Sequence, residues 1–409
     1  MKKYDEYKDS DVAWIGEVPK HWEVIPLKFT GTFGNGLTYS PKEIVDKGIL
    51  VLRSSNIQNS SLSFEDNVYV SKVPRDLLVN KGDIIICSRN GSAALVGKSA
   101  FVDKELNATF GAFMMRYIPN IEKKYGFYLF QTAIGQYKGY FSTTTINQLT
   151  KTTIGEIKIP LAMLEEQAAI ATYLDTHCAK IDNLISIQQK RIALLQELKQ
   201  SVITHAVTKG LNPNVEMKQS GVEWIGDVPK HWEVRRLKYI TYMQSGETIS
   251  PNDFNDDGKY PVFGGNGFRG YTDRYTNEGR HVLIGRQGAL CGNINYASGR
   301  FYASEHAIVV YPLHDEDITW IGESMRACDF NRYSQTAAQP GIAVNNIKNI
   351  IFPYPSLQEQ KQIAAYLNHK CATIDTSISN AQHQIELLQE YKQSLITEVV
   401  TGKRKVTDN

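Results

Sequence analysis

Two short loops carry the side chains best suited to contact the edges of DNA bases. Ser88-Arg89-Asn90-Gly91-Ser92 follows one short apolar run, and Arg286-Gln287-Gly288 follows another. Arginine pairs with guanine, and asparagine or glutamine with adenine, each through two hydrogen bonds, while glycine lets the backbone approach a groove closely. The parallel predicts DNA contact by both loops, although a structural ion pair is an equally open role for Arg89 and Arg286.

Two further segments, rich in Thr, Asn and Gln, stand at matching positions directly before long helical patterns. They are FSTTTINQLTK at 141–151 and SQTAAQPGIAVNNIKN at 334–349. Such side chains bond phosphates or base edges, but they also cap helices and turn the chain. The run GGNGFRGY at 264–271 lacks the strand-then-helix context of a dinucleotide site, so it predicts a tight loop that presents Arg269. The candidate DNA contacts are Arg53, Ser88, Arg89, Asn90, Ser92, Thr143, Thr144, Thr145, Asn147, Asn266, Arg269, Tyr271, Arg286, Gln287, Gln335, Gln339, Asn345 and Asn346.

Motifs for catalysis are missing from the sequence. It has no GxxxxGK[S/T] phosphate loop and no PD…(D/E)xK nuclease cluster, and Asn212-Pro213-Asn214-Val215 departs from the NPPY motif of amine methyltransferases. The five cysteines form no CxxC pair, and no histidine pair at helical spacing stands with a carboxylate. We therefore expect neither an enzyme nor a metal site. The alternative is an active site formed by Cys291, Glu305 and His306, which one half of the chain would possess alone.

The candidate residues belong to a tandem repeat. WIGEVPKHWEV at 14–24 returns as WIGDVPKHWEV at 224–234, and EQxxIAxYL returns from Glu166 at Glu359. The first block recurs after 210 residues and the second after 193, so the insert between them is 17 residues longer in the first copy, and its sequence differs. The repeated segments are nearly identical, whereas the two inserts between them differ in sequence. This pattern predicts that the two inserts share one geometry and recognise two different targets.

Each repeat ends in one long predicted helix with a coiled-coil seam. The helix over 164–207 would be roughly 66 Å long, and Gly210 and Gly402 supply stops. Ser356 and Glu359 form a capping-box pattern before the second helix. Because the first helix leads to the second globular domain and the second must return, we expect an antiparallel pair in a dumbbell with pseudo-twofold symmetry. The seam positions of the first helix are Ile170, Leu174, Cys178, Ile181, Ile185, Ile192, Leu195 and Val202.

We expect an α+β fold: two strand-rich globular domains joined by two long antiparallel helices that form a coiled coil, in a pseudo-twofold tandem repeat. The runs at 83–87, 281–285 and 307–311 predict strands, and 125–141 predicts a helix. The predicted domains are 1–159 and 210–354, with helices in 160–209 and 355–409.

Composition is that of an ordinary globular protein, 42% hydrophobic and 22% charged with net charge +2. Residues 25–158 hold 16 Lys and Arg against 10 Asp and Glu, whereas residues 235–352 hold 12 against 12, nine of these cations being Arg. This Arg bias suits bidentate recognition of bases or phosphates. No apolar run approaches the roughly 20 residues that span a bilayer, and no secretory signal is visible, so we expect a soluble, cytoplasmic protein without a membrane partner.

The duplicated boxes, paired helices and unlike inserts resemble the specificity subunit of type I restriction-modification systems. Phrases that carry the resemblance include GDIIICSRNGSAALVGKSAF at 82–101, HVLIGRQGALCGN at 281–293 and QPGIAVNNIKNIIFPYPSLQEQKQIAAYL at 339–367. It implies that the inserts are target recognition domains, each contacting one half of a bipartite site in double-stranded DNA. It further implies two methyltransferase subunits as partners, restriction/translocase subunits joined through the complex, no cofactor on this chain, and S-adenosylmethionine, ATP and Mg on the partners.

Symmetry assigns partner docking to the repeated frame, because two nearly identical surfaces recruit two copies of one partner. The tryptophans of the boxes, Trp14, Trp22, Trp224 and Trp232, are expected to pack where each insert joins a helix end. A coiled-coil scaffold without DNA contact is the remaining alternative. The candidate docking residues are Glu166, Gln167, Lys199, Gln200, Glu359, Gln360, Lys392 and Gln393.

Overall fold

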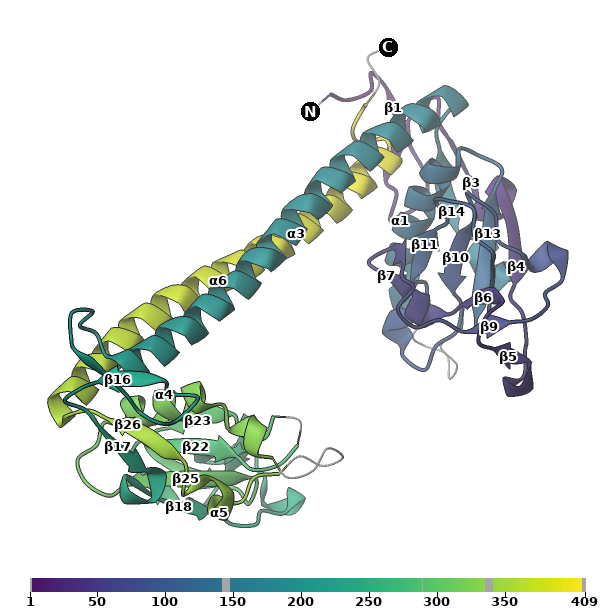
Figure 1. Cartoon of the computed structure of the whole chain (residues 1–409). Coiled ribbons are helices and arrows are strands. Elements are labelled where there is room, and N and C mark those ends of the chain that lie inside the picture. Colours follow the sequence, from purple (N-terminus) through teal and green to yellow (C-terminus); the bar gives the residue numbers. More distant parts are fainter. Residues whose placement is uncertain (1, 142–147, 289, 335–340, 407–409) are drawn as a thin grey trace. The chain divides into compact units, whose positions relative to one another are not determined.

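The computed structural model describes residues 2–141, 148–288, 290–334 and 341–406, and it divides into two compact units. Unit 1 comprises Met1–Ile187 with Gln384–Asn409, and unit 2 comprises Gln188–His383. Each unit holds one insert domain together with a part of each long helix (Figure 1). Each unit therefore contains one insert of the repeat, but the boundary between the units lies within both long helices and not at the repeat boundary near Gly210.

Unit 1 contains two four-stranded sheets. The first is antiparallel, in the order β11-β10-β13-β4, and the second has the order β12-β6-β9-β5 with β12 and β6 parallel. Apolar side chains of β10 are buried on both of its faces, as expected for the central run at 83–87. The strands are β4 (Gly31–Asn35), β5 (Ile44–Val45), β6 (Ile49–Leu52), β9 (Tyr69–Val70), β10 (Ile84–Cys87), β11 (Ser99–Phe101), β12 (Ala108–Phe110) and β13 (Met114–Pro119).

Unit 2 repeats this topology with a different sequence. Its antiparallel sheet has the order β18-β25-β22-β23, and its second sheet, β20-β19-β24-β21, again contains one parallel pair, β19 with β24. The unlike inserts thus share one backbone frame and differ at the edge of the second sheet. The strands are β18 (Thr241–Ser245), β19 (Tyr260–Gly264), β20 (Gly267–Thr272), β21 (Asn277–Glu278), β22 (His281–Gly285), β23 (Ile294–Ala297), β24 (Arg300–Ala303) and β25 (Ala307–Pro312).

Short paired strands surround these sheets and connect them to the helices. One pair in each unit lies in the box region, and another joins the box to the segment before the long helix. They are β1 (Tyr7–Asp9) with β2 (Glu17–Pro19), β3 (Glu23–Pro26) with β14 (Lys158–Leu161), β15 (Met217–Gln219) with β16 (Asp227–Pro229), β17 (Glu233–Arg236) with β26 (Ile351–Tyr354), and β7 (Ile57–Gln58) with β8 (Ser61–Leu62).

The three predicted helices are present as α1, α3 and α6, whereas α2, α4 and α5 were not predicted. The antiparallel sheet of unit 1 contacts α1 through β11, and that of unit 2 contacts α4 through β22 and β23. The long helices α3 and α6 end at glycines in the left-handed region, Gly210 at φ +75° and Gly402 at φ +74°. The helices are α1 (Lys123–Phe141), α2 (Lys151–Gly155), α3 (Leu164–Lys209), α4 (Ile318–Cys328), α5 (Val344–Ile347) and α6 (Leu357–Val400).

The predicted seam of α3 is buried in its first half and half-buried in its second half, where the buried residues are instead Ile203 and Val207. In unit 1, Ile170, Leu174, Cys178 and Ile181 of α3 share a core with Leu395 and Val399 of α6; in unit 2, Ile203 and Val207 share one with Ile363 and Leu367. Ile192, Leu195 and Val202 are only half-buried, because two paired helices without a third layer leave part of the seam open to solvent.

Within each unit the two helices run antiparallel. Lys392 of α6 binds both carboxylate oxygens of Asp182 of α3 at 2.7 Å in unit 1, whereas Tyr173, earlier in α3, lies beside the later Arg404. In unit 2 the repeat-equivalent pair, Lys199 with Asp375, has the same distances. The antiparallel pairing predicted from chain order is confirmed within both units.

Candidate nucleic-acid interface

The end of the central strand places the two predicted loops in equivalent positions. The amide of Ser88 donates to the carbonyl of Phe113 at 3.0 Å, and in unit 2 the amide of Arg286 donates to the carbonyl of His306 at 2.9 Å. Ser88 is therefore the counterpart of Arg286, and Arg89 is the counterpart of Gln287. The predicted match of Arg89 with Arg286 is wrong by one residue, because the R-x-G letters align one place away from the backbone hydrogen bonds.

A third segment reaches the same place in each unit. The amide of Leu149 donates to the carbonyl of Ser88 at 2.7 Å, and the amide of Ile342 donates to that of Arg286 at 2.8 Å. Isolated bridges pair Arg89 with Gln148 and Gln287 with Gly341. The segments before the long helices thus meet the loops after β10 and β22, as their matching positions suggested. Thr143, Thr144, Thr145, Asn147, Gln335 and Gln339 lie outside the described residues.

In unit 1, the exposed part of this site is a cation over an aromatic ring. The guanidinium carbon of Arg89 lies 5.4 Å from the ring centroid of Phe113, whose surface is 61% exposed. Asn90 donates to the Ser54 hydroxyl at 3.3 Å, and its side-chain oxygen accepts the amide of Ser92 at 3.0 Å. Arg89, Asn90 and Ser92 therefore share one solvent-facing loop.

Two predicted contacts of unit 1 have structural roles. Ser88 is 7% exposed and its hydroxyl donates to the Phe113 carbonyl at 3.0 Å, so its side chain does not face a groove. Arg53 binds the Asp66 carboxylate at 2.8 Å and also donates to the Asp66 carbonyl. Hydrogen bonds from Ser55 and Arg53 lower the pKa of Asp66. The prediction for Ser88 is corrected by its burial, and the guanidinium of Arg53 is occupied within the domain.

In unit 2, the corresponding site combines one hydrogen bond with a contact between a histidine and a carboxylate. The side-chain oxygen of Gln287 lies 2.9 Å from Nδ1 of His306, and Nε2 of His306 lies 3.1 Å from a carboxylate oxygen of Glu305. Arg286 is half-buried and donates to the Glu305 carbonyl at 3.4 Å, which favours the structural role for this arginine. Gln287 is the exposed member of the pair.

The turn between β19 and β20 packs against the backbone of Gln287 and His306. A Cβ on Gly265 would lie 3.1 Å from the His306 carbonyl and 3.3 Å from the Gln287 carbonyl, so only glycine fits this approach without displacement. Asn266 at the tip is exposed and accepts a hydrogen bond from Asn293 at 3.1 Å. The turn therefore adds Asn266 to the surface that Gln287 presents.

Arg269 is exposed, but it lies in strand β20 and not in the predicted tight loop. Gly267 adopts φ +94°, and the guanidinium carbon of Arg269 lies 5.5 Å from the Phe254 ring centroid. Tyr271 is exposed and packs edge-on against Phe268, with ring centroids 5.0 Å apart. In α5, Asn345 is exposed and Asn346 is half-buried with its amide nitrogen inside the fold.

Phe113 is not among the predicted contacts, and His306 was assigned only to the alternative active site. Both stand in the turn directly before the strand next to the central strand, in FGAFM and ASEHA, and this shared place was the available signal. Cys291, the third member of the alternative active site, is 1% exposed. Within the described residues, no group of three or more His, Cys, Asp and Glu is arranged to hold a metal ion.

The boxes form the same latch in both units. Trp22 donates to Glu166 at 2.8 Å with His21 at 3.0 Å from the same oxygen, and Trp232 donates to Glu359 at 3.0 Å with His231 at 2.8 Å. Trp22 and Trp232 are buried, whereas Trp14 and Trp224 are half-buried, which confirms the packing role. Burial alone would raise the pKa of Glu359, but hydrogen bonds from Trp232, His231 and Ser356 outweigh it and lower that pKa.

Gln167 and Gln360 do not face a partner surface. They are 4% and 1% exposed, and each donates to a backbone carbonyl just before its helix, those of Ala162 and Pro355. Each side-chain oxygen also accepts a backbone amide of the insert domain, at 3.0 Å in both units. Their predicted docking role is therefore wrong. The two glutamines occupy equivalent repeat positions because each one connects the start of a long helix to its insert domain by hydrogen bonds.

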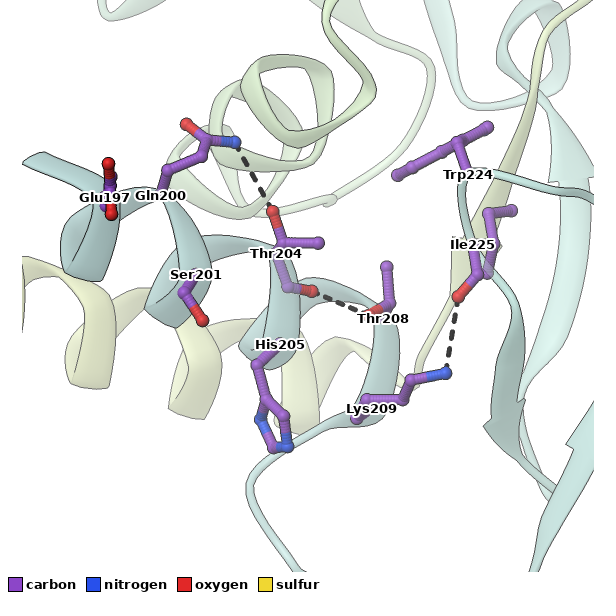
Figure 2. A pocket seen from close by; sticks show the side chains of 9 residues that line it. All are labelled: Glu197, Gln200, Ser201, Thr204, His205, Thr208, Lys209, Trp224 and Ile225. Carbon is purple, nitrogen blue, oxygen red and sulfur yellow. Dashed lines mark hydrogen bonds between the residues drawn. The ribbon is translucent and has the colours of Figure 1, made fainter.

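The remaining docking candidates divide into paired and open residues. Lys199 and Lys392 are bound to aspartates of the other helix, so their charges serve the helix pair. Gln200 lines a groove of about 580 Å³ in unit 2, between α3 and the box residues Trp224 and Ile225 (Figure 2). In Figure 2, Gln200 donates to Thr204 at the rim, and Lys209 ties the helix end to the Ile225 carbonyl. Gln393 is exposed in unit 1.

No helix in the described part of the chain is long and apolar enough to cross a membrane.

Comparisons with known proteins extend over both units. The family model described as type I restriction modification DNA specificity domain matches residues 19–197 and 229–387. The type I restriction enzyme EcoprrI specificity subunit of Escherichia coli is 40% identical over 149 residues, which cover 36% of this chain and 37% of that protein. The EcoKI specificity subunit of Escherichia coli strain K12 is 24% identical over 95% of this chain and 90% of its own length.

A solved structure shows the same fold. It comes from work on complex assembly and conformational transition of the type I R-M system, and it matches with a TM-score of 0.70 at 14% identity, covering 94% of this chain and 98% of the other. Since the family model matches a segment in each repeat, and these together exceed half of the sequence, the chain belongs to the family of type I restriction-modification DNA specificity subunits.

Proposed function

We propose that each insert domain contacts one half of a bipartite site in double-stranded DNA and that the chain itself catalyses no reaction. The observation that carries the proposal is one backbone position with different side chains. Arg89 beside Phe113 in unit 1 stands where Gln287 beside His306 stands in unit 2. A shared frame that presents different hydrogen-bonding groups is what two different half-sites require.

The chemistry of the two positions differs in a way that DNA distinguishes. Arginine offers two donors and favours the two acceptors of guanine, whereas the glutamine amide, whose oxygen faces His306, offers one donor group to an acceptor on a base. Phe113 adds an exposed apolar face that suits a thymine methyl group or an unstacked base. The two domains are therefore expected to select different base pairs at equivalent steps.

The repeated frame is proposed to dock two methyltransferase subunits. The latch between the box and the helix start is the same in both units, so any surface built around it is presented twice. Beside this latch in unit 1 lies a cavity of about 730 Å³, lined in part by Lys20, Glu165 and Glu166. In unit 2, the groove at Gln200 also lies next to a box, but at a position that is not repeat-equivalent to this cavity. S-adenosylmethionine, ATP and Mg would then act on the partner subunits, including the restriction/translocase subunits, and the complex would work in the cytoplasm.

Selection from a pool of random duplexes by the purified full-length chain tests DNA recognition. We expect enrichment of two short sequences separated by a constant number of unselected base pairs, with binding that weakens as salt rises. A matched variant, Arg89→Ala, should lose preference within one half-site only. No retention of duplexes at any salt concentration would support the coiled-coil scaffold instead, and retention without enrichment of any sequence would refute sequence recognition.

A further inference from the structure

In unit 2, a hydrogen bond from His306 holds the exposed amide of Gln287 in one orientation. The Gln287 oxygen faces Nδ1 of His306 at 2.9 Å, and the opposite ring nitrogen faces the Glu305 carboxylate at 3.1 Å. The carboxylate is itself placed by the backbone, because its other oxygen accepts the amide of Ile249 at 3.3 Å. These contacts therefore connect the backbone amide of Ile249 to the solvent-facing side chain of Gln287.

The direction of the hydrogen bond follows from its partners. An amide oxygen only accepts, so Nδ1 of His306, which faces the Gln287 oxygen, carries the proton and donates. Once its oxygen is turned toward His306, the Gln287 amide presents its NH2 group to solvent. An amide without such a partner is free to rotate and to present either end.

We propose that His306, placed by Glu305, is a positioning residue that makes Gln287 a donor toward one base pair of the half-site contacted by unit 2. This inference rests on the proposed DNA recognition and names the base chemistry of that site. An outward NH2 group matches a major-groove acceptor, which guanine, adenine and thymine offer, and opposes the exocyclic amine of cytosine. The base recognised there is expected to offer an acceptor to Gln287.

A comparison with unit 1 explains why only unit 2 needs a residue that orients the recognition side chain. At the equivalent positions it has Arg89, Phe113 and Ala112, so its aromatic residue has no ring nitrogen and the preceding residue has no carboxylate. A guanidinium carries donors at every nitrogen, and rotation does not change what it presents. An amide has two chemically opposite ends, and therefore needs an orienting partner to be selective.

The test uses the full-length chain and selection from random duplexes, with four proteins compared. Gln287→Ala first identifies the base pair that depends on Gln287. His306→Phe keeps a ring of similar size, and it is the residue that unit 1 already carries, but it removes the donor. His306→Asn keeps a side-chain NH2 close to the place of Nδ1, so it preserves a donor to the Gln287 oxygen.

We expect His306→Phe to reduce the preference at that single base pair roughly tenfold, toward acceptance of cytosine, since each paired base contact contributes a discrimination of this order. His306→Asn should retain most of the preference, and the half-site of unit 1 should remain unchanged in every protein. Equal effects of the Phe and Asn variants, or an unchanged preference in His306→Phe, would overturn the inference. Selection of no sequence by the unaltered chain would instead refute the proposed function.

Discussion

Lengthening both long helices by one turn should lengthen the unselected spacer of the DNA site. The change inserts four helix-forming residues between Ile187 and Gln188 of α3 and four between His383 and Gln384 of α6. These points lie at the boundaries of the two units, so the contacts inside each unit are kept, including both lysine–aspartate pairs. The insertion alters the helical path between the units and nothing within them.

The magnitude follows from helix geometry. Four α-helical residues add about 6 Å of rise and about 40° of net rotation. Two base pairs add about 6.8 Å, and with about 10.5 base pairs per turn they add about 70°. The closest match is therefore a spacer longer by two base pairs, with a residual twist of about 30° that the helices or the DNA must absorb. We expect the selected spacer to gain two base pairs and the affinity to fall.

The spacer is measured directly by sequencing the duplexes that the full-length chain selects. As a matched control, the same four residues are placed after Asn212, in the exposed linker that follows α3, where they add no helical rise. The control should select the original spacer. An unchanged spacer at full affinity in the helix variant would show that the helices do not set the distance, and a changed spacer in the linker variant would argue against the helices as the ruler.

Four further outcomes test the remaining inferences. Exchanging residues 25–155 for the insert of another specificity subunit should change one half-site and leave the other, as read by duplex selection; a change in both would contradict modular recognition. Glu359→Gln should lower the free energy of unfolding by about 1 kcal/mol at pH 7. Because the pKa of Glu359 is lowered in the folded state, its contribution to stability is complete above the ordinary glutamate pKa of about 4.3 and is lost as the pH falls through the folded pKa. Urea unfolding of both proteins at several pH values measures this dependence. A double-mutant cycle of Lys392→Ala and Asp182→Ala should give a favourable coupling energy of about 0.2–1 kcal/mol, since the side chains of both residues are partly exposed. A coupling energy indistinguishable from zero would show that this pair does not stabilise the helix register. Mass measurement of the saturated complex should find two methyltransferase subunits per chain, whereas one would refute symmetric docking.

Much of the fold followed from patterns that depend only on neighbouring residues. The long helices, the capping box at Ser356 and the glycine stops were all predicted correctly, because helix length and helix ends are local properties of the chain. The repeat placed each box next to a helix start, and the latch from Trp22 to Glu166 confirms it. The central strands at 84–87 and 281–285 followed from apolar runs.

The candidate site was less predictable, because burial and pairing depend on distant segments. Ser88 has the right chemistry for DNA contact, but its hydroxyl is directed to a carbonyl 25 residues away. Gln167 and Gln360 have the polarity of surface residues, yet both are buried as ties between helix and insert. Polar side chains enter a core when backbone groups there need partners, and the sequence contains no local signal of that need.

The sequence by itself determined that the chain is a repeat of one frame around two unlike inserts, since identity between WIGEVPKHWEV and its copy requires no structure to be seen. It also determined which loops hold arginine, asparagine and glutamine after a strand. Only the tertiary structure decided that Arg89 corresponds to Gln287 and that Phe113 and His306 stand beside them. The physical reason is that register is set by hydrogen bonds between strands far apart in the chain, and a shift of one residue turns a side chain from the surface into the core.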